Sequence, residues 1–278
     1  MFAGFVMVTL AAASWGTWSL FLRQAALPPG VSTALVFAIM ALAGIPIALR
    51  EPPGRWDRTT WLLVFANAAA DGLNLVAFFS AMAHTTVAIA VLTHYAAPVL
   101  IALAAPRIDG VASPGAKPAA VVALAGLVII LEPWRAPADG ALIGAALGFV
   151  SACAYATNVF LVRRLAVRIG PARALSLHSA IAAVVALPLV GPQLAAVTAR
   201  QLAYMAAGGI TIGALSGVVF ALGLLRIGSA RASVLTYAEP VVAVAIGALV
   251  WGEVLHPLAA LGGALIVGAG IHVARKAR

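Results

Sequence analysis

The chain has little of what a soluble protein needs on its surface. Only 9% of its 278 residues are charged, whereas 64% are hydrophobic, and the mean hydropathy is +1.09. A soluble fold of this length could not cover its core with so few polar side chains. The single cysteine, Cys153, excludes an intramolecular disulfide and a thiolate metal cluster. The composition therefore predicts an all-α membrane protein.

Motifs for nucleotide hydrolysis and for metal catalysis are also missing. The sequence has no Gly-x-x-x-x-Gly-Lys-Ser/Thr loop, so we do not expect this chain to hydrolyse ATP. It has no His-Glu-x-x-His segment, no paired carboxylates and no second cysteine, which a metal site or an activated nucleophile would need. We expect no cofactor, no metal and no enzymatic activity, and keep a membrane-embedded enzyme as an alternative.

Long apolar segments fill most of the chain. A helix needs about 20 apolar residues to cross a bilayer, and charges, proline and glycine mark its ends. The first segment has no basic region before it and carries bulky tryptophans, so we expect a retained helix and not a cleaved signal peptide. We predict ten transmembrane helices, at residues 2–24, 31–49, 60–82, 85–105, 117–134, 140–162, 173–190, 201–224, 230–250 and 256–274.

The basic residues are distributed unevenly between the predicted loops. With the N-terminus inside, 14 of the 17 lysines and arginines lie on the inner side, and only Arg23, Arg135 and Arg200 lie outside. This bias is typical of membrane proteins whose basic loops stay in the cytoplasm. It accounts for the net charge of +9 without a nucleic-acid partner. We predict a multi-pass protein of the bacterial inner (plasma) membrane, with both termini cytoplasmic.

The second half of the chain repeats the first at an offset of 142 residues. The strongest matches are Phe78 with Phe220 and the Tyr-Ala-x-Pro of residues 95–98 with that of residues 237–240. The beginnings of the halves agree more weakly, at an offset of 140. Because each repeat has an odd number of helices, the two copies must cross the membrane in opposite directions. We predict two inverted five-helix repeats, at residues 1–137 and 138–278.

This arrangement resembles the drug/metabolite transporter (DMT) superfamily, in particular its EamA-type members. The resemblance is carried by the five-plus-five helices, by Pro98 and Pro240, and by residues 251–255 and 261–268, which read Trp-Gly-Glu-Val-Leu and Leu-Gly-Gly-Ala-Leu-Ile-Val-Gly. The first repeat departs from this pattern, with Arg-Ile-Asp-Gly at residues 107–110. The resemblance implies a ten-helix transporter that exports small solutes, amino acids among them.

Three polar residues are predicted to share one face of the third helix. Asn67, Asp71 and Asn74 are spaced four and then three residues apart, which places them on one side of a helix. A carboxylate inside a bilayer is costly unless it is paired or hydrated, so we expect this face to line a substrate or coupling site. At the same offset the eighth helix has Gly209 and Gly213, which indicate helix packing or close approach to a ligand.

Proline interrupts the fourth and ninth helices. Pro98 and Pro240 cannot donate to the carbonyls of His94 and Thr236 four residues earlier, so we expect two kinks with free carbonyls beside a cavity. A role of the prolines in helix packing alone is the alternative. Tyr95 and Tyr237 precede the prolines at matching positions, and we expect both to contact substrate.

Glu239, His94 and Asp71 are the candidates for protonation in a proton-coupled step. A structural hydrogen bond of His94, or an ion pair between Glu239 and Arg231, would be the simpler explanation. Further side chains near the start of each half are candidate walls of the cavity, although tryptophans near helix ends also form interfacial belts. These residues are Trp15, Trp18, Tyr155 and Asn158.

The other histidines, at positions 84, 178, 256 and 272, are interpreted as loop or interface residues without chemistry. The Arg163-Arg164 pair is interpreted as a topology anchor. The hypothesis that fits all of these features is a secondary transporter that exports small neutral or zwitterionic solutes by alternating access. A passive channel is another alternative. The expected partners are a small-molecule substrate, the lipid bilayer and protons, and the oligomeric state is left open.

Overall fold

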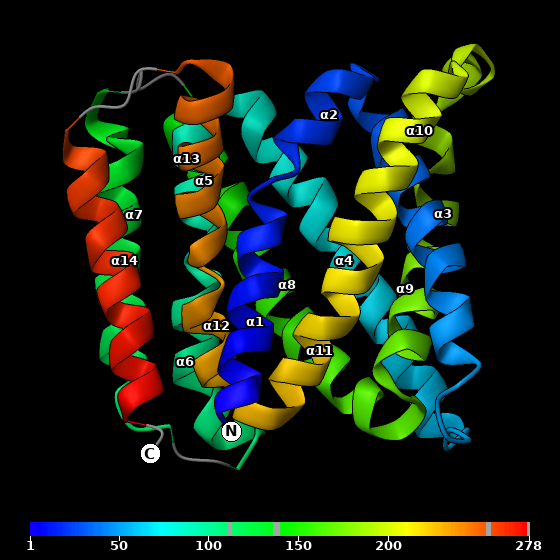
Figure 1. Cartoon of the computed structure of the whole chain (residues 1–278), viewed down its shortest axis with the longest axis horizontal. Helices are drawn as coiled ribbons and strands as arrows, with labels where there is room; N and C mark the ends of the chain where they lie inside the picture. The colour runs from blue at the N-terminus through cyan, green and yellow to red at the C-terminus, as the bar shows by residue number, and fades with distance from the viewer. Residues whose placement is uncertain (111–112, 136–139, 254–256, 277–278) are drawn as a thin grey trace.

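The structure is a bundle of helices lying side by side. This computed structural model describes residues 1–110, 113–135, 140–253 and 257–276. Every regular element within these ranges is a helix, which confirms the predicted all-α class. Most helices run between the same two ends of the bundle, and the N-terminus and the end of the last helix lie together at one of them (Figure 1). We call that end the termini face and the other the opposite face.

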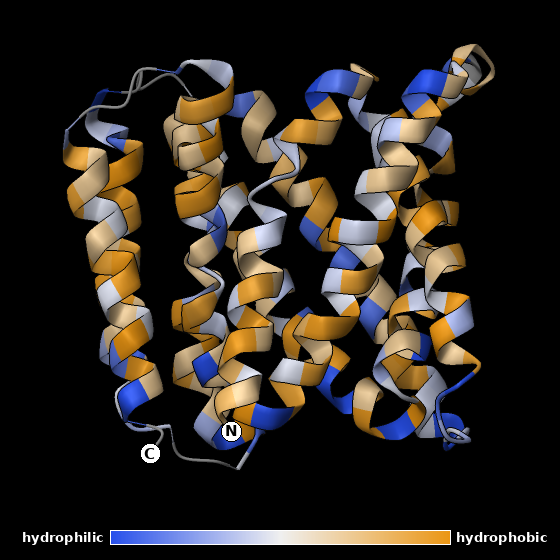
Figure 2. Cartoon of the chain, viewed as in Figure 1, coloured by the Kyte–Doolittle hydropathy of each residue, from blue (hydrophilic) through white to orange (hydrophobic). Residues whose placement is uncertain are grey.

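The surface of the bundle is apolar along its length. Hydrophobic residues cover the helices, and hydrophilic residues gather at the two ends (Figure 2). Within the described ranges, nine helical segments are long and apolar enough to cross a membrane, and α9 (Pro171–Ala186) is a shorter apolar tenth. Its 16 residues span about 24 Å, a little less than a bilayer core. These segments confirm the predicted ten-helix membrane protein.

The first five spans are α1 (Phe2–Trp15) with α2 (Ser19–Ala25), α3 (Pro29–Ala48), α4 (Arg58–His84), α5 (Val87–His94) with α6 (Ala97–Ile108), and α7 (Ala116–Leu131). The last five are α8 (Ala141–Ile169), α9, α10 (Ala199–Gly208) with the π-helical η4 (Gly209–Leu215) and α11 (Ser216–Ile227), α12 (Ser229–Leu235) with α13 (Ala238–Trp251), and α14 (Leu258–Arg275). Short 3₁₀ turns η1 (Pro133–Arg135), η2 (Leu187–Leu189) and η3 (Gly191–Ala196) lie in the loops at the opposite face.

The helix contacts follow a two-fold pattern. If each span is exchanged with the one five places later, the contacts of α3 with α9, α6 with α12 and α7 with α14 map onto themselves. The contact of α4 with α8 maps onto the contact of α11 with α1. This pattern matches two five-helix halves facing each other, as inverted repeats would. The predicted boundary between residues 137 and 138 lies outside the described residues.

Three spans are broken near their middle. The fourth divides at Tyr95 and Ala96, and the ninth at Thr236 and Tyr237, in both cases shortly before a proline. The Thr236 carbonyl is not free as expected, because the backbone N–H of Glu239 donates to it at 3.0 Å in place of the missing proline donor. The first span also divides, between α1 and α2, without a proline.

Small residues let the helices approach closely. A Cβ atom added to Gly126 of α7 would lie 2.6 Å from the Gly262 carbonyl oxygen of α14, and one added to Gly262 would lie 2.4 Å from the Gly126 carbonyl oxygen. Only glycine at both positions permits this backbone contact. Alanine is the commonest residue of the largest buried cluster, which joins both halves. Close packing of small residues therefore replaces large apolar side chains along these contacts.

Candidate functional site

The predicted polar face of α4 points into the bundle. Asn67 is 1% exposed, and neither its side-chain oxygen nor its nitrogen has a hydrogen-bond partner among the described residues. Asn74 accepts a hydrogen bond from the Ser151 hydroxyl of α8 at 2.7 Å. An unpaired polar group inside a protein costs about 1–3 kcal/mol. Asn67 therefore offers both a donor and an acceptor to any polar group that reaches it.

Asp71 faces a histidine of another span. Its Oδ2 atom lies 2.8 Å from Nε2 of His178 on α9, and both side chains are 13% exposed. The Phe37 ring meets the His178 ring edge-on, with 5.9 Å between centroids. His178 is therefore not a loop residue, because it lies inside α9 with its ring against a carboxylate. It joins the carboxylate of α4 to the second half of the chain.

His94 is also tied to α8. Its Nδ1 atom lies 2.8 Å from the Ser151 hydroxyl oxygen, and that hydroxyl donates its single hydrogen to Asn74. Nδ1 must therefore carry the hydrogen that completes the chain from His94 through Ser151 to Asn74. In the neutral ring this leaves Nε2 as an acceptor. The ring contacts Phe78 and Tyr155, with centroids 4.9 and 5.4 Å apart.

The two broken spans contact each other through their tyrosines. The Tyr237 hydroxyl donates to the Tyr95 carbonyl oxygen at 2.7 Å, and the two ring centroids are 5.8 Å apart. Tyr237 is fully buried. Its hydroxyl therefore satisfies a carbonyl that the break in the fourth span would otherwise leave without a donor.

Glu239 lies beside these aromatic rings and not beside a base. Its carboxyl group is near the side chains of Tyr95 and Tyr155, and Tyr155 is also near Asp71. Arg231, the alternative partner, instead points to the sulfur of Met1 at 3.9 Å. The predicted ion pair between Glu239 and Arg231 is therefore wrong, because Arg231 lies at the start of α12 and Glu239 lies past the break.

These residues form one group, which we call the central polar cluster. Tyr155 lies near Asp71, His94, Tyr95 and Glu239. The members of the group come from the third, fourth, sixth, seventh and ninth spans. Sequence reasoning missed Ser151 and His178, because only the fold brings them to this place. The cluster consists of Asp71, Asn74, His94, Tyr95, Ser151, Tyr155, His178, Tyr237 and Glu239.

The remaining predicted residues lie around this cluster. Trp15 is partly buried and packs against Phe220, with ring centroids 5.0 Å apart, and not in an interfacial belt. Trp18 packs on α10, where a Cβ added to Gly208 would lie 3.0 Å from its ring. Asn158 is 8% exposed, and its side-chain nitrogen has no hydrogen-bond partner in the described chain.

The glycines of the eighth span serve helix packing. Added Cβ atoms at Gly209 and Gly213 would lie 2.7 and 2.5 Å from side-chain atoms of Ile39 and Met40 on α3. These glycines therefore hold the eighth span against the second, as the packing interpretation predicts.

Gly16 holds the break in the first span against α13. A Cβ atom added there would lie 2.4 Å from the Glu239 carbonyl oxygen and 2.8 Å from the backbone nitrogen of Ala243. The first span thus touches the backbone of the residue that carries a cluster carboxyl group. Only glycine allows this approach, so the position of Glu239 depends on Gly16.

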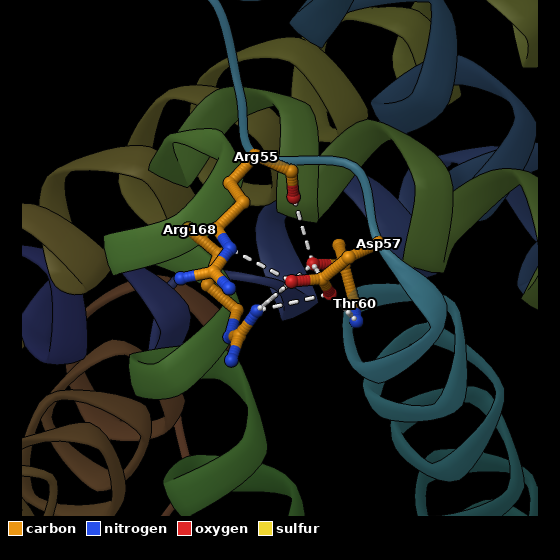
Figure 3. Close-up of polar contacts among 4 residues, drawn as sticks. All are labelled: Arg55, Asp57, Thr60 and Arg168. Atoms are coloured by element: carbon orange, nitrogen blue, oxygen red, sulfur yellow. Dashed lines mark hydrogen bonds and ion pairs between the residues drawn. The ribbon is translucent and has the colours of Figure 1, made fainter.

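Carboxylates of the first half bind groups of the second half at the termini face. The Asp57 carboxylate accepts hydrogen bonds from Nη1 of Arg168 at 3.1 Å to each oxygen, and the backbone N–H of Arg55 donates to the Arg168 carbonyl at 2.8 Å. Thr60 lies beneath this pair and donates to the Arg55 carbonyl at 2.7 Å. Figure 3 shows the four side chains converging between α4 and the end of α8.

Two more carboxylates act in the same way. Glu51 caps the start of α9, because its two oxygens accept the backbone N–H groups of Ala172 and Arg173 at 2.8 and 3.0 Å. Asp109 lies 3.1 Å from Nη1 of Arg163 and accepts the backbone N–H of Ser229 at 3.1 Å. Arg163 is thus more than the topology anchor that we predicted. We call these contacts of Glu51, Asp57 and Asp109 with the second half the inter-half latch.

Asp57 is held in its charged form. The backbone N–H of Thr60 donates to it at 2.8 Å, and with the Thr60 hydroxyl and Arg168 it lowers the pKa of Asp57 from 3.8 to about 2. The Asp57 carboxylate is therefore ionised throughout the neutral range, and its contact with Arg168 keeps its charge there.

Two surface grooves flank α8 near the termini face. The α4–α8 groove has a volume of about 380 Å³ and is lined by Thr59, Leu63, Arg163, Arg164, Val167 and Arg168. A second groove of about 540 Å³, between α6 and α8, includes Arg107, Cys153 and Phe160 in its lining. Neither groove includes the central polar cluster, so the predicted central pocket stays a prediction.

The second half of the chain matches a known protein family over most of its length. Residues 142–274 match the EamA-like transporter family. The second half of the chain is therefore similar to this family. The matched segment contributes Ser151, Tyr155, His178, Tyr237 and Glu239 to the central polar cluster. The second half of the chain is thus similar to a family of transporters, and the apolar helices of the described residues indicate a multi-pass membrane protein.

Two further likenesses extend over both halves. An uncharacterized transporter of Archaeoglobus fulgidus is 28% identical over 281 residues, which cover 98% of this chain and 96% of that protein. A solved crystal structure superposes with a TM-score of 0.82 at 22% identity and covers 98% of each chain. The first half, outside the EamA match, therefore shares a known fold together with the matched segment.

Proposed function

We propose that this protein is a secondary transporter that exports small neutral or zwitterionic organic solutes by alternating access. Amino acids, other metabolites and amphipathic drugs are the candidate substrates. The observation that carries the proposal is the central polar cluster, in which polar side chains of both halves meet where the fourth and ninth spans are broken. Polar sites built by broken helices between two repeats are typical of secondary transporters.

The chemistry of the cluster favours a zwitterion or a neutral polar solute. The Glu239 carboxylate would hold an ammonium group, and the tyrosine rings beside it would hold an apolar side chain. The unpaired amide of Asn67 would supply hydrogen bonds to the other end of a solute. Asp71 is already engaged by His178 at 2.8 Å, which leaves Glu239 as the carboxylate that faces a solute.

Alternating access requires that the two faces open in turn. At the termini face the inter-half latch joins the halves through three carboxylates. At the opposite face, the ion pair of Arg23 with Glu253 is half exposed, with side-chain exposures of 52% and 50%. Exposed pairs of this kind contribute little, about 0–1 kcal/mol. We interpret the structure as the state closed at the termini face, which we assign to the cytoplasm.

The distribution of charge supports the same assignment. The termini face carries most of the arginines and lysines, as basic cytoplasmic loops do. We therefore propose the bacterial inner membrane as the location, with both termini in the cytoplasm. The proton gradient, acting through Glu239 or the Asp71–His178 pair, or the gradient of the solute itself would supply the energy.

The test is counterflow in proteoliposomes. Vesicles that hold the purified protein are preloaded with unlabelled amino acids, nucleosides or drugs, and the uptake of the labelled compound is followed. A carrier accelerates uptake when the same compound is inside, whereas a channel does not. Failure of every compound in the panel to give counterflow would contradict the proposal.

Two conservative variants connect transport with the cluster. We expect Glu239→Gln and Asp71→Asn to reduce counterflow at least tenfold, with normal insertion and yield, because each removes a charge that the mechanism uses. Glu253→Gln is the matched control, since its carboxylate lies at the opposite face and is half exposed. Wild-type exchange by both cluster variants would remove these residues from the mechanism.

A further inference from the structure

The α4–α8 groove has features that the transport of a solute does not explain. It lies outside the central polar cluster, between the start of α4 and the end of α8. One wall is apolar, formed by Leu63 and Val167, and Val167 is 72% exposed. Leu62 and Phe65, on the same helix as Leu63, are also largely exposed. In a chain of this type, such a surface faces the acyl chains of the bilayer.

Three arginines line the part of the groove near the termini face. Arg168 is paired with Asp57, and Arg163 is paired with Asp109. Arg164 has neither an ion pair nor a hydrogen bond among the described residues, and Nε of Arg163 is buried without an acceptor. Counting only these pairs, three positive charges face two negative ones. The groove therefore has positive charge and donors that the protein does not satisfy.

An anionic phospholipid satisfies both parts of this groove. Guanidinium groups bind phosphate oxygens well because their N–H donors match the spacing of these oxygens. The apolar wall next to them would hold the first part of an acyl chain. A free phosphate ion would use the arginines and leave Leu63 and Val167 without a role. Basic sites between spans on the cytoplasmic side attract the anionic lipids that are enriched there.

We propose that the α4–α8 groove is a binding site for an anionic phospholipid. The phosphate contacts the exposed guanidinium group of Arg164, and one acyl chain lies along Leu63 and Val167. Arg168 remains bound to Asp57, so the lipid sits directly beside the inter-half latch. The inference is independent of the solute that the protein moves.

The test is a lipid titration of the purified full chain in detergent, followed by native mass spectrometry. Phosphatidylglycerol and phosphatidylcholine with identical acyl chains are compared. We expect the wild type to retain phosphatidylglycerol preferentially, and Arg164→Gln to bind it about fivefold more weakly. Arg164→Lys keeps the charge and should retain most of the affinity. Arg50→Gln is the matched control, because Arg50 is exposed on the same face, outside the groove.

A second variant tests the apolar wall without a change in charge. Val167→Trp should fill the groove and weaken phosphatidylglycerol binding, while Val167→Leu should leave it unchanged. Equal binding of the two lipids, or an equal loss in Arg164→Gln and Arg50→Gln, would overturn the proposal. Displacement of the lipid by equimolar inorganic phosphate would also overturn it, since the site would then be one for a free anion. Thermal unfolding of each variant identifies any that is misfolded. If Arg164→Gln is misfolded, the affinity of Arg164→Lys for phosphatidylglycerol decides whether the charge at this position binds the lipid.

Discussion

Gly16→Ala is the sharpest test of how the central polar cluster is positioned. The new Cβ atom would lie 2.4 Å from the Glu239 carbonyl oxygen, whereas ordinary contacts begin at 3.4 Å. The first span and α13 must therefore separate by about 1 Å, the difference between these two distances. The contacted atoms belong to the backbone of α13, so no side-chain rotation can relieve the overlap.

Two opposing effects decide the sign of the stability change. Gly16 has helical angles, φ −61° and ψ −15°, so alanine fits the backbone and would stabilise the fold by about 0.4–1 kcal/mol. Overpacking costs about 1–3 kcal/mol. We expect a net loss of about 1–2 kcal/mol. We also expect counterflow to fall on the order of tenfold or more, because displacements of about 1 Å at a functional site are costly.

The assay combines thermal unfolding in detergent with counterflow in proteoliposomes. Gly268→Ala is the matched control, since Gly268 lies inside α14 and a Cβ added there would meet no atom within 4 Å. It should be as stable as the wild type or slightly more so, and should exchange solute normally. If Gly16→Ala behaved like Gly268→Ala in both measurements, the contact between the first span and α13 would not position Glu239.

Two further predictions concern the broken helices and the inter-half latch. Pro98→Ala and Pro240→Ala each restore a backbone N–H and remove a helix disruption worth about 3 kcal/mol. We therefore expect solute exchange to slow on the order of tenfold, while the solute concentration that gives half-maximal exchange stays constant. Weaker solute binding at an unchanged exchange rate would contradict this. Asp57→Asn should lower the unfolding temperature at pH 7. The pKa of Asp57 falls from 3.8 to about 2 on folding, so its contribution to the free energy of unfolding is complete above about pH 4 and disappears as the pH falls through about 2. The unfolding temperatures of wild type and variant should therefore converge at that pH. A difference in unfolding temperature that does not change with pH would argue against the latch.

Local features of the fold were predictable from the sequence because they depend on nearby residues. Apolar length located the ten spans, and prolines at positions 98 and 240 located two of the breaks. The break at Gly16 was not predictable in this way. It depends on the backbone of α13, more than two hundred residues away. Glycine can occur in an apolar segment for many reasons, so its presence alone does not indicate such a contact.

The candidate site was predictable as a set of residues but not as a set of contacts. The spacing of Asn67, Asp71 and Asn74 identified an inward face of α4, yet nothing local identifies His178 as the partner of Asp71. That pairing requires knowing that α4 lies against α9. The prediction of a free carbonyl at Thr236 was wrong for a local reason. The backbone tightens before Pro240, so that the N–H of Glu239 donates to the Thr236 carbonyl.

The inter-half latch also makes the two halves of the chain unequal partners. Its three carboxylates all belong to the first half, and the arginines and helix starts that receive them all belong to the second. A dimer of two first halves in opposite orientations would place these carboxylates at opposite faces and would lack Arg163 and Arg168. The two halves are thus complementary and not interchangeable, and co-expressed separate halves should assemble only as a mixed pair.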